Sequence, residues 1–137
     1  MGLIVDSSEA ISAERLGLTA YQMVERIARL GGDEEIAVSV VSVLELAHGV
    51  ARAESPPRRV KRQQFLDDLL AEIPVHPVTV PIALRAGQLD GRMQATGKRA
   101  ALADLLIGAT ALELGYSVLT SNRRHFDQIP GLTVVGS

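Results

Sequence analysis

The chain contains no cysteine, and only 3% of its 137 residues are aromatic. Without cysteine neither a disulfide nor a thiolate metal site can form, so we expect a protein of the reducing cytoplasm. Few aromatic rings leave few platforms for base stacking, which argues against single-strand-binding proteins that depend on it. No apolar run approaches the ~18 residues of a membrane span, and no basic region with a hydrophobic stretch opens the chain. The formal net charge of −2 gives no overall attraction to nucleic acid, so any such binding needs a local patch.

The chain is rich in aliphatic residues, and hydrophobic residues make up 47% of it. This length and composition predict one domain over residues 1–137. Strand patterns occur at 3–5, 36–41, 118–119 and 132–135, with a short extended piece around 78–80. Helical patterns occur at 9–17, 19–32, 43–53, 58–72 and 82–95, and in a central helix from 104 to 115. The alternation of strands and helices predicts a three-layer α/β/α domain with a mostly parallel sheet.

The central helix is almost wholly apolar, but a carboxylate, Asp104, stands at its head. Because it shows no polar stripe, we expect it to be buried on all sides and to end at Gly115 as a C-terminal cap. A charged side chain in the most apolar helix needs a reason, and one reason is that it caps the helix. The other is that it binds a metal ion.

Two further carboxylates occupy comparable places. Asp6 follows the first strand, and Glu45 lies in about the first turn of the helix after the second strand. Taken singly, Asp6 could cap a helix and Glu45 could complement a helix dipole. Together with Asp104 they should converge at the carboxyl edge of a parallel sheet. Because clustered carboxylates repel one another unless a cation joins them, and because oxygen ligands suit hard ions, we expect Mg²⁺ or Mn²⁺ there.

Four motifs in this order resemble those of PIN-domain ribonucleases, and more narrowly of the VapC toxins of toxin–antitoxin pairs. The motifs are DSS at 6–8, VLELAHG at 43–49, DLLIGATA at 104–111, and LTSNRRHF at 119–126 followed by PGL at 130–132. The resemblance covers essentially the whole chain. It implies a PIN-like fold and a Mg²⁺- or Mn²⁺-dependent endoribonuclease toxin that cleaves RNA with a metal-activated water. It also implies a cognate antitoxin that blocks the active site, and a homodimer or toxin–antitoxin hetero-oligomer.

Carried over by position, the resemblance makes Asp6, Glu45 and Asp104 the metal-binding and catalytic carboxylates, with Ser7 helping to orient the site. The family usually has a fourth acid where Asn122 or His125 stands. Neither is acidic here, which puts a second metal ion in doubt. Asn122 can still offer a carbonyl oxygen. His125 could contact phosphate, although a surface histidine is the commoner interpretation, and the nearby Asp127 should point elsewhere.

An acidic site needs basic groups around it to bind an anionic chain. We expect Lys98 and Arg99 before the central helix, and Arg123 and Arg124 after the last buried strand, to rim the cleft and contact RNA. The basic residues around 58–62 could equally form a solvated face. The two helices at 43–53 and 58–72 should pair as a hairpin whose surface suits an antitoxin segment.

Two other classes of function compete with the nuclease. A phosphoacceptor receiver domain also gathers acids at strand ends, but it wants a second acid and a lysine where Ser7 and Asn122 stand. A catalytically weak PIN-like module that binds RNA or a partner is the stronger rival, because the fourth acid is missing. An RNA cleavage assay with and without divalent metal separates the three.

Overall fold

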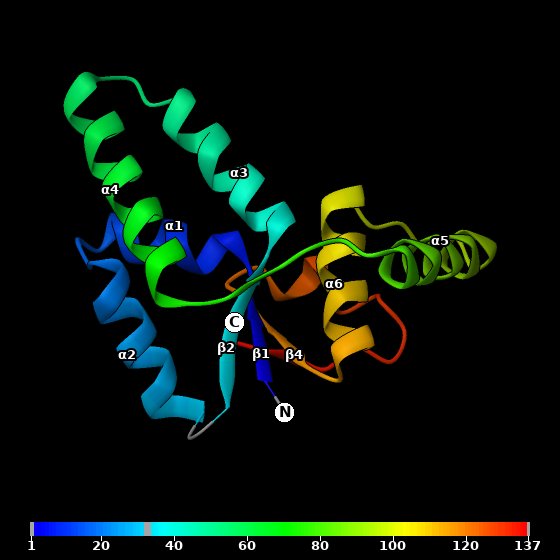
Figure 1. Cartoon of the computed structure of the whole chain (residues 1–137). Coiled ribbons are helices and arrows are strands. Elements are labelled where there is room, and N and C mark those ends of the chain that lie inside the picture. Colours follow the sequence, from blue (N-terminus) through cyan, green and yellow to red (C-terminus); the bar gives the residue numbers. More distant parts are fainter. Residues whose placement is uncertain (1, 32–33, 137) are drawn as a thin grey trace.

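A five-stranded parallel sheet forms the centre of the protein (Figure 1). The computed structural model describes residues 2–31 and 34–136. The strand order is β3-β2-β1-β4-β5 and every pairing is parallel. The strands are β1 (Gly2–Val5), β2 (Glu35–Ser39), β3 (Val75–His76), β4 (Ser117–Leu119) and β5 (Val134–Val135). The prediction of a mostly parallel sheet with a late edge strand is therefore confirmed.

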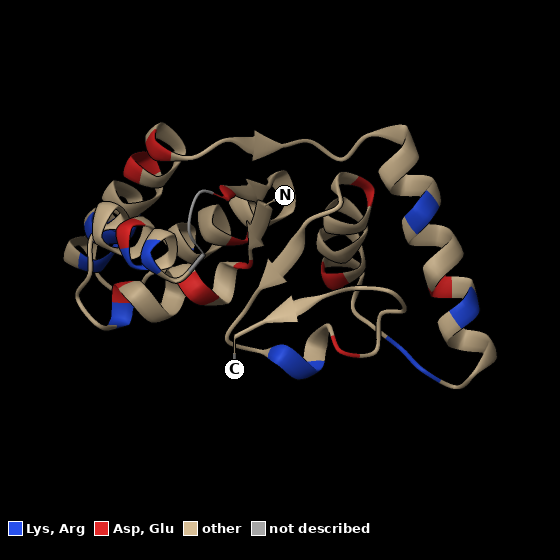
Figure 2. Cartoon of the chain, turned by 90° about the horizontal axis from the view of Figure 1, so that it is seen from below, with Lys and Arg blue, Asp and Glu red and all other residues tan. Residues whose placement is uncertain are grey.

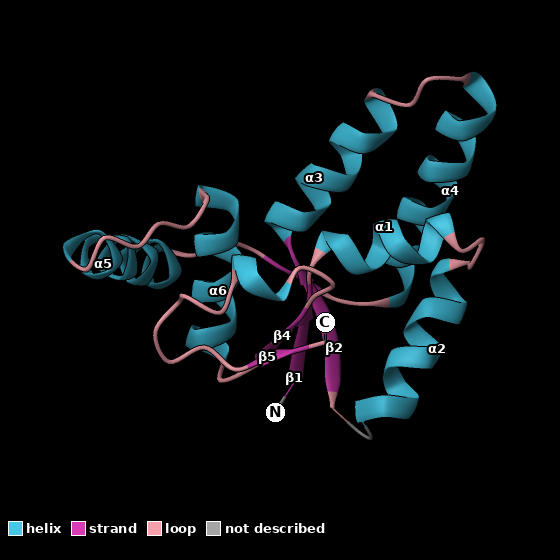
Figure 3. Ribbon diagram, turned by 180° about the vertical axis from the view of Figure 1, so that it is seen from behind, coloured by secondary structure: helices cyan, strands magenta, loops and turns pink. Residues whose placement is uncertain are grey.

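Helices cover both faces of this sheet (Figures 1 and 3). One face carries α1 (Ser7–Arg15), α2 (Ala20–Gly31), α3 (Val40–Ala51) and α4 (Pro56–Glu72), and the other carries α5 (Val80–Ala95) and α6 (Leu102–Leu114). A short 3₁₀ helix, η1 (Arg123–His125), follows β4. The three-layer α/β/α architecture agrees with the prediction. Within residues 2–31 and 34–136, no helix is long and apolar enough to cross a membrane.

The sheet supplies two separate cores because successive side chains of a strand point to opposite faces. Leu3 and Val5 of β1 pack under α1, α2 and α4, while Ile4 packs under α6, whose other side contacts α5. A strand buried on both faces must be apolar at every position, and all four residues of β1 are buried. This explains why its sequence shows a continuous apolar run rather than an alternation.

The helix α2 starts at the capping box that the sequence predicts. Thr19 Oγ1 accepts from the backbone N–H of Gln22 at 3.1 Å, and Gln22 Oε1 accepts from the N–H of Thr19 at 2.9 Å. The apolar pattern predicts Ala20, Val24, Ile27 and Ala28 on the buried face of this helix, but Ala28 is exposed and Met23 is buried instead. The predicted C-terminal end of this helix, at residue 32, lies outside the described residues.

The helix α6 is the buried helix of the second layer, but only its middle is enclosed. Residues 107–111 are buried, whereas Leu102 is 71% exposed and Leu114 is 37% exposed, so the expectation of burial on all sides is wrong at the ends. Gly115 ends the helix in the left-handed region with φ of 72°, as expected. The N-cap is Ala101, so Asp104 is not a capping residue.

Several boundaries differ from the sequence prediction, and side-chain caps explain most of them. The helix α3 begins at Val40 rather than 43, because Ser39 accepts the N–H of Val41. Similarly, Thr79 caps α5 at Val80, so the extended piece lies at 75–76 instead of 78–80. The helices α3 and α4 form the expected hairpin (Figure 1). The apolar pattern predicts that α4 and the residue after it bury Leu66, Leu69, Leu70 and Ile73, but Leu70 is exposed.

Candidate active site

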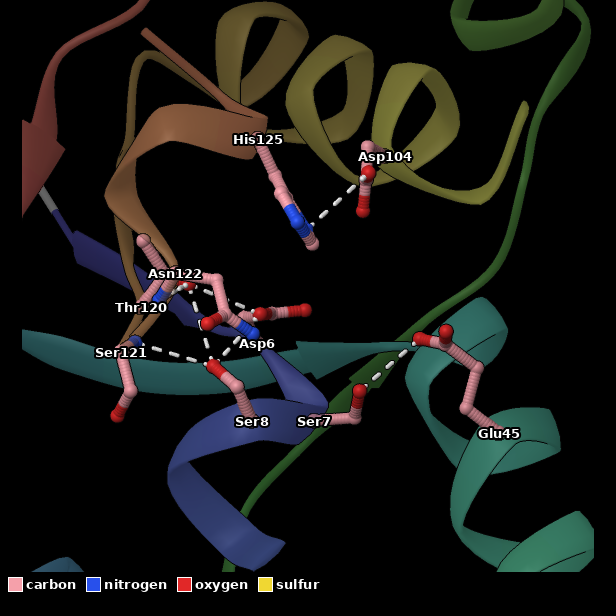
Figure 4. A network of polar contacts seen from close by, with 9 residues as sticks. All are labelled: Asp6, Ser7, Ser8, Glu45, Asp104, Thr120, Ser121, Asn122 and His125. Atoms are coloured by element: carbon pink, nitrogen blue, oxygen red, sulfur yellow. Dashed lines mark hydrogen bonds and ion pairs between the residues drawn. The ribbon is translucent and has the colours of Figure 1, made fainter. Parts of the chain in front are cut away.

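Three acidic side chains face one another at the carboxyl edge of the sheet (Figure 4). Asp6 directly follows β1, Glu45 comes from α3, and Asp104 comes from α6. Burial raises the pKa values of Glu45 and Asp104, and the charge of Asp6 raises both further, so these carboxylates lie close enough to Asp6 to be repelled by it. The convergence expected from the sequence therefore occurs.

Hydroxyl groups hold Asp6 in place. Its Oδ2 accepts from Ser8 Oγ at 2.8 Å and from Thr120 Oγ1 at 2.9 Å, and the residue is only 6% exposed. Asp6 stands at the N-cap position of α1, but its side chain makes no capping hydrogen bond. The interpretation of Asp6 as a helix cap is therefore wrong, and its carboxylate belongs to the site.

The loop after β4 connects to the same hydroxyls. The N–H of Ser121 donates to Ser8 Oγ at 3.0 Å, and the N–H of Asn122 donates to Thr120 Oγ1 at 2.9 Å. Because these bonds come from the backbone, they fix the loop whatever the side chain of Asn122 does. Figure 4 shows that side chain on the same side of the site as Asp6. Asn122 thus lies where the family resemblance expects a fourth acid.

Glu45 lies in the second turn of α3, because that helix begins earlier than predicted. Its Oε1 accepts from Ser7 Oγ at 3.1 Å, which gives Ser7 its contact with the site. Burial raises the pKa of Glu45, and the negative charges of Asp6 and Asp104 raise it further against the opposing hydrogen bond from Ser7. A carboxylate in this setting gains from any cation placed beside it.

Asp104 is the third residue of α6, and its side chain is only 17% exposed. Burial raises its pKa and the charge of Asp6 adds to the rise, whereas His125 opposes it. His125 Nδ1 lies 3.8 Å from Asp104 Oδ2, which is longer than a hydrogen bond. The imidazole is half exposed, as expected of a surface histidine, and it lies beside Asp104 (Figure 4).

The donor chemistry of this cluster suits a hard divalent ion, since it consists of carboxylate oxygens whose mutual repulsion a cation would relieve. The side chains do not close around one point, however. Across residues 2–31 and 34–136, no three acidic or histidine side chains are close enough together to hold one ion as they stand. The residues fit a magnesium or manganese ion in the kind of oxygen ligand that they offer.

The basic residues expected to contact RNA come from the segments directly before α6 and directly after β4. Lys98 and Arg99 lie in the loop before α6 and Arg123 and Arg124 lie in η1, and Figure 2 shows both segments on the same side of the molecule. Arg123 already forms an ion pair within the protein, because its Nε lies 3.3 Å from Asp127 Oδ1. That ion pair also directs Asp127 to Arg123, in line with the expectation that Asp127 points elsewhere.

Two residues that hold the acids were missed as functional positions in the sequence. Ser8 and Thr120 both donate to Asp6, and they also lie 3.2 Å from each other. The signal that could have found them is a short hydroxyl side chain within three residues of the end of a buried strand, at the edge where ligands bind. Both residues lie within the motifs quoted above.

The described residues also form a pocket of about 190 Å³ beside Glu45. It lies between α1, α3 and α4, on the side of the site away from the basic loops. Leu46 and Phe65 contribute apolar surface to it, and Glu14, Arg15 and Arg62 contribute charged groups besides Glu45. The acidic site therefore opens on one side to basic segments and on the other to a mainly apolar pocket.

Comparison with known proteins agrees with this geometry. The PIN domain family matches residues 3–132. Ribonuclease VapC10 of Mycobacterium tuberculosis is 35% identical over 124 residues, covering 90% of this chain and 86% of the relative. Ribonuclease VapC1 of Rickettsia felis is 28% identical over 135 residues, covering 98% and 96%. The crystal structure of VapBC2 from Rickettsia felis, bound to a DNA fragment from its promoter, has a TM-score of 0.86 at 20% identity, covering 100% of this chain and 99% of that one. The chain belongs to the PIN-domain family and, within it, to the VapC proteins.

Proposed function

We propose that the protein is a Mg²⁺- or Mn²⁺-dependent endoribonuclease that acts as the toxin of a toxin–antitoxin pair. The observation that carries the proposal is the convergence of Asp6, Glu45 and Asp104 at one edge of the sheet, where repulsion and burial raise two of their pKa values. The two relatives described above are named ribonucleases, which supports RNA as the substrate.

The three carboxylates would hold the ion. When bound, a divalent ion neutralises charge on the scissile phosphate and activates a water for in-line attack. Other residues of the chain hold the carboxylates in position. Ser8 and Thr120 hold Asp6, and Ser7 holds Glu45, so that two carboxylates keep fixed directions before substrate arrives. Asp104 is fixed by the first turn of α6.

The basic segments on the α6 side would bind the RNA backbone. Arg124 and the Lys98–Arg99 loop offer cations to phosphates that flank the site, and such contacts give affinity without sequence preference. The side chain of His125, the last residue of η1, extends toward Asp104, where it can donate to a phosphate oxygen of the bound strand. Charge-neutralising variants of Lys98 or Arg124 should weaken RNA binding and reduce its salt dependence.

A protein partner is part of the same proposal. The R. felis structure described above is a VapBC complex, and the α3–α4 hairpin of this chain exposes Leu44 and Val60, each at 69%. Such surface apolar groups suit an antitoxin segment. Co-expression with the neighbouring small open reading frame should give a stable complex and suppress toxicity. Light scattering should show that this complex is a hetero-oligomer and that the free protein is a homodimer.

The test is cleavage of RNA by the purified protein with Mg²⁺, with Mn²⁺ and with excess chelator. Asp6→Asn, Glu45→Gln and Asp104→Asn should each lower the rate by orders of magnitude while circular dichroism stays unchanged. The control is Asp67→Asn, which removes an exposed carboxylate on α4. Undiminished cleavage in chelator would end the metal proposal.

The second candidate is a PIN-like module that binds RNA or a partner without cleaving it. The observation in its favour is that the described side chains do not preassemble a three-ligand site. Binding of RNA with unchanged affinity in all three variants, and no cleavage by the wild type, would establish it.

A further inference from the structure

The pocket beside Glu45 shares that residue with the acidic site. Its walls come from α1, α3 and α4, and its volume is about 190 Å³. An apolar cavity of about 150 Å³ accepts benzene, so this one accommodates a single flat ring system but not a stack of rings. Leu46 and Phe65 provide apolar surface of the kind that packs against the face of a ring.

The charged groups of the pocket stand at its α1–α4 side. Arg62 extends from α4 to both neighbouring helices: its Nη1 donates to the carbonyl of Gly49 at 2.8 Å, and its Nε lies 4.0 Å from Glu14 Oε1. The second distance is longer than a hydrogen bond, so the Glu14 carboxylate keeps its capacity to accept donors from a ligand. An apolar slot with the Glu14 carboxylate and the Arg62 guanidinium side by side, and with Arg15 and Glu45 also in its lining, matches a flat heterocycle that carries both donors and acceptors.

Continuity with the acidic site limits what that heterocycle can be. Glu45 belongs to both, so a phosphate held at the acids places the base of the adjoining nucleotide, one sugar away, at the pocket. Among the four bases, guanine presents two adjacent donors, N1–H and N2–H₂, to a carboxylate, and its O6 and N7 accept from an arginine. The charged pair Glu14–Arg62 complements that pattern.

We propose that this pocket binds a guanine base next to the scissile phosphate and so selects the cleavage site; the proposal rests on the ribonuclease function above. Glu14 accepts from N1–H and N2–H₂, and Arg62 donates to the acceptor edge. The base faces pack on Leu46 and Phe65. The basic loops on the other side of the site bind backbone only, so sequence selection comes from the α1–α3–α4 side.

The chain offers a variant that fills the pocket without crowding the core. Gly49 lies in α3 at the pocket, and a Cβ there would meet no atom within 4 Å. A helical side chain leans over the preceding turn, so Gly49→Leu would project toward Leu46 and Glu45. Replacing a mid-helix glycine also favours the helix. Gly91→Leu in α5 is the matched control, since a Cβ at Gly91 is equally unobstructed and lies in the layer beyond the sheet.

The experiment measures cleavage of RNA oligonucleotides that differ at one position next to the cleavage site, with guanine, inosine, adenine, cytosine or uracil. Wild type and Gly91→Leu should cleave the guanine substrate at least about ten-fold faster than the adenine, cytosine and uracil substrates, and inosine, which lacks N2–H₂, should fall between. Gly49→Leu and Glu14→Gln should lose the preference. A parallel arm measures binding of the guanine and inosine oligonucleotides to the Asp104→Asn variant by fluorescence anisotropy.

The outcomes separate the pocket from the ribonuclease function. Equal cleavage of all five substrates, or an unchanged preference in Gly49→Leu, overturns the pocket proposal and leaves the ribonuclease function intact. If Gly49→Leu weakens only the complex with a protein partner, the pocket holds a partner side chain and the proposal also fails. If the wild type cleaves no RNA, the ribonuclease function fails, and the binding arm alone decides whether guanine is recognised.

Discussion

Replacing Asp104 by asparagine should stabilise the metal-free protein, although it removes a polar interaction at a helix end. Burial and the charge of Asp6 disfavour the ionised carboxylate. Two carboxylates ~5–10 Å apart repel by about 2–3 kcal/mol at an effective dielectric constant near 20. The favourable interaction of Asp104 with the N-terminus of α6 opposes this by about 0.3–1 kcal/mol. The net gain on neutralisation is then about 1–2 kcal/mol.

The ion pair between Asp104 and His125 also contributes to the stability difference between wild type and Asp104→Asn, and the measurement must exclude that contribution. At a distance of 3.8 Å a protonated, half-exposed imidazole would contribute about 1 kcal/mol or less. A measurement at pH 8, where imidazoles are ordinarily neutral, eliminates that contribution. For a domain of this size we therefore expect Asp104→Asn to raise the Tm in chelator by roughly 3–10 °C.

The assay is thermal unfolding of wild type and Asp104→Asn in chelator and in Mg²⁺ or Mn²⁺. Wild type should gain about 2.7 kcal/mol when the free metal is at a hundred times its Kd, and the variant should gain much less. Asp67→Asn on the surface controls for a general change of charge. A variant that melts below wild type in chelator would show that Asp104 has a structural role, and the electrostatic reasoning would be wrong.

Three further measurements test other parts of the structure. The folded-state pKa values of Glu45 and Asp104 are raised above 4.5 and 3.8, the values for the unfolded chain. The protonated carboxyl groups therefore stabilise the fold fully at a pH below 3.8, and this stabilisation is lost as the pH rises through the folded-state pKa values. Denaturant titrations in chelator should show this loss, and carboxamide variants should flatten it. Ser42 Oγ is the buried side-chain polar atom without a partner among the described residues, so Ser42→Ala should be neutral or stabilise by up to about 1 kcal/mol in the same titrations; Thr110→Val, which removes a 2.7 Å hydrogen bond, should cost about 1 kcal/mol. Calorimetry without RNA should find one metal per protomer, and His125→Asp should add a second site and lower the Mg²⁺ needed for cleavage; one ion in both proteins would mean that this position does not reach the metal.

The layer order and the sheet could be predicted from the sequence because the relevant signals are local. A strand that is apolar at every position must be buried on both faces, as in β1, and that alone favours a parallel sheet with helices on either side. The capping box at Thr19 and the glycine at 115 mark helix ends through bonds within a few residues. Such signals do not depend on the rest of the fold.

The start of α3 was misplaced for the opposite reason. Val40 and Val41 continue the apolar run of β2, and their preference for extended structure hides the cap at Ser39. The consequence reaches the site, because Glu45 lies one turn deeper in the helix than expected. Leu70 and Ala28 were misjudged because periodicity gives the apolar face of a helix but not how far the neighbouring helix covers it.

The acids of the site could be placed at one edge from the sequence, but their support could not. Which carboxylate oxygen receives which hydroxyl depends on how β1 and β4 lie side by side, and Ser8 and Thr120 are 112 residues apart. The position of His125 depends on η1, a turn without apolar periodicity. The arrangement that results is uneven: hydroxyls fix Asp6 and Glu45, whereas Asp104 has a histidine as its neighbour, too far for a hydrogen bond. Hydroxyl donors therefore hold two of the three carboxylates, whereas the first turn of α6 alone positions the third.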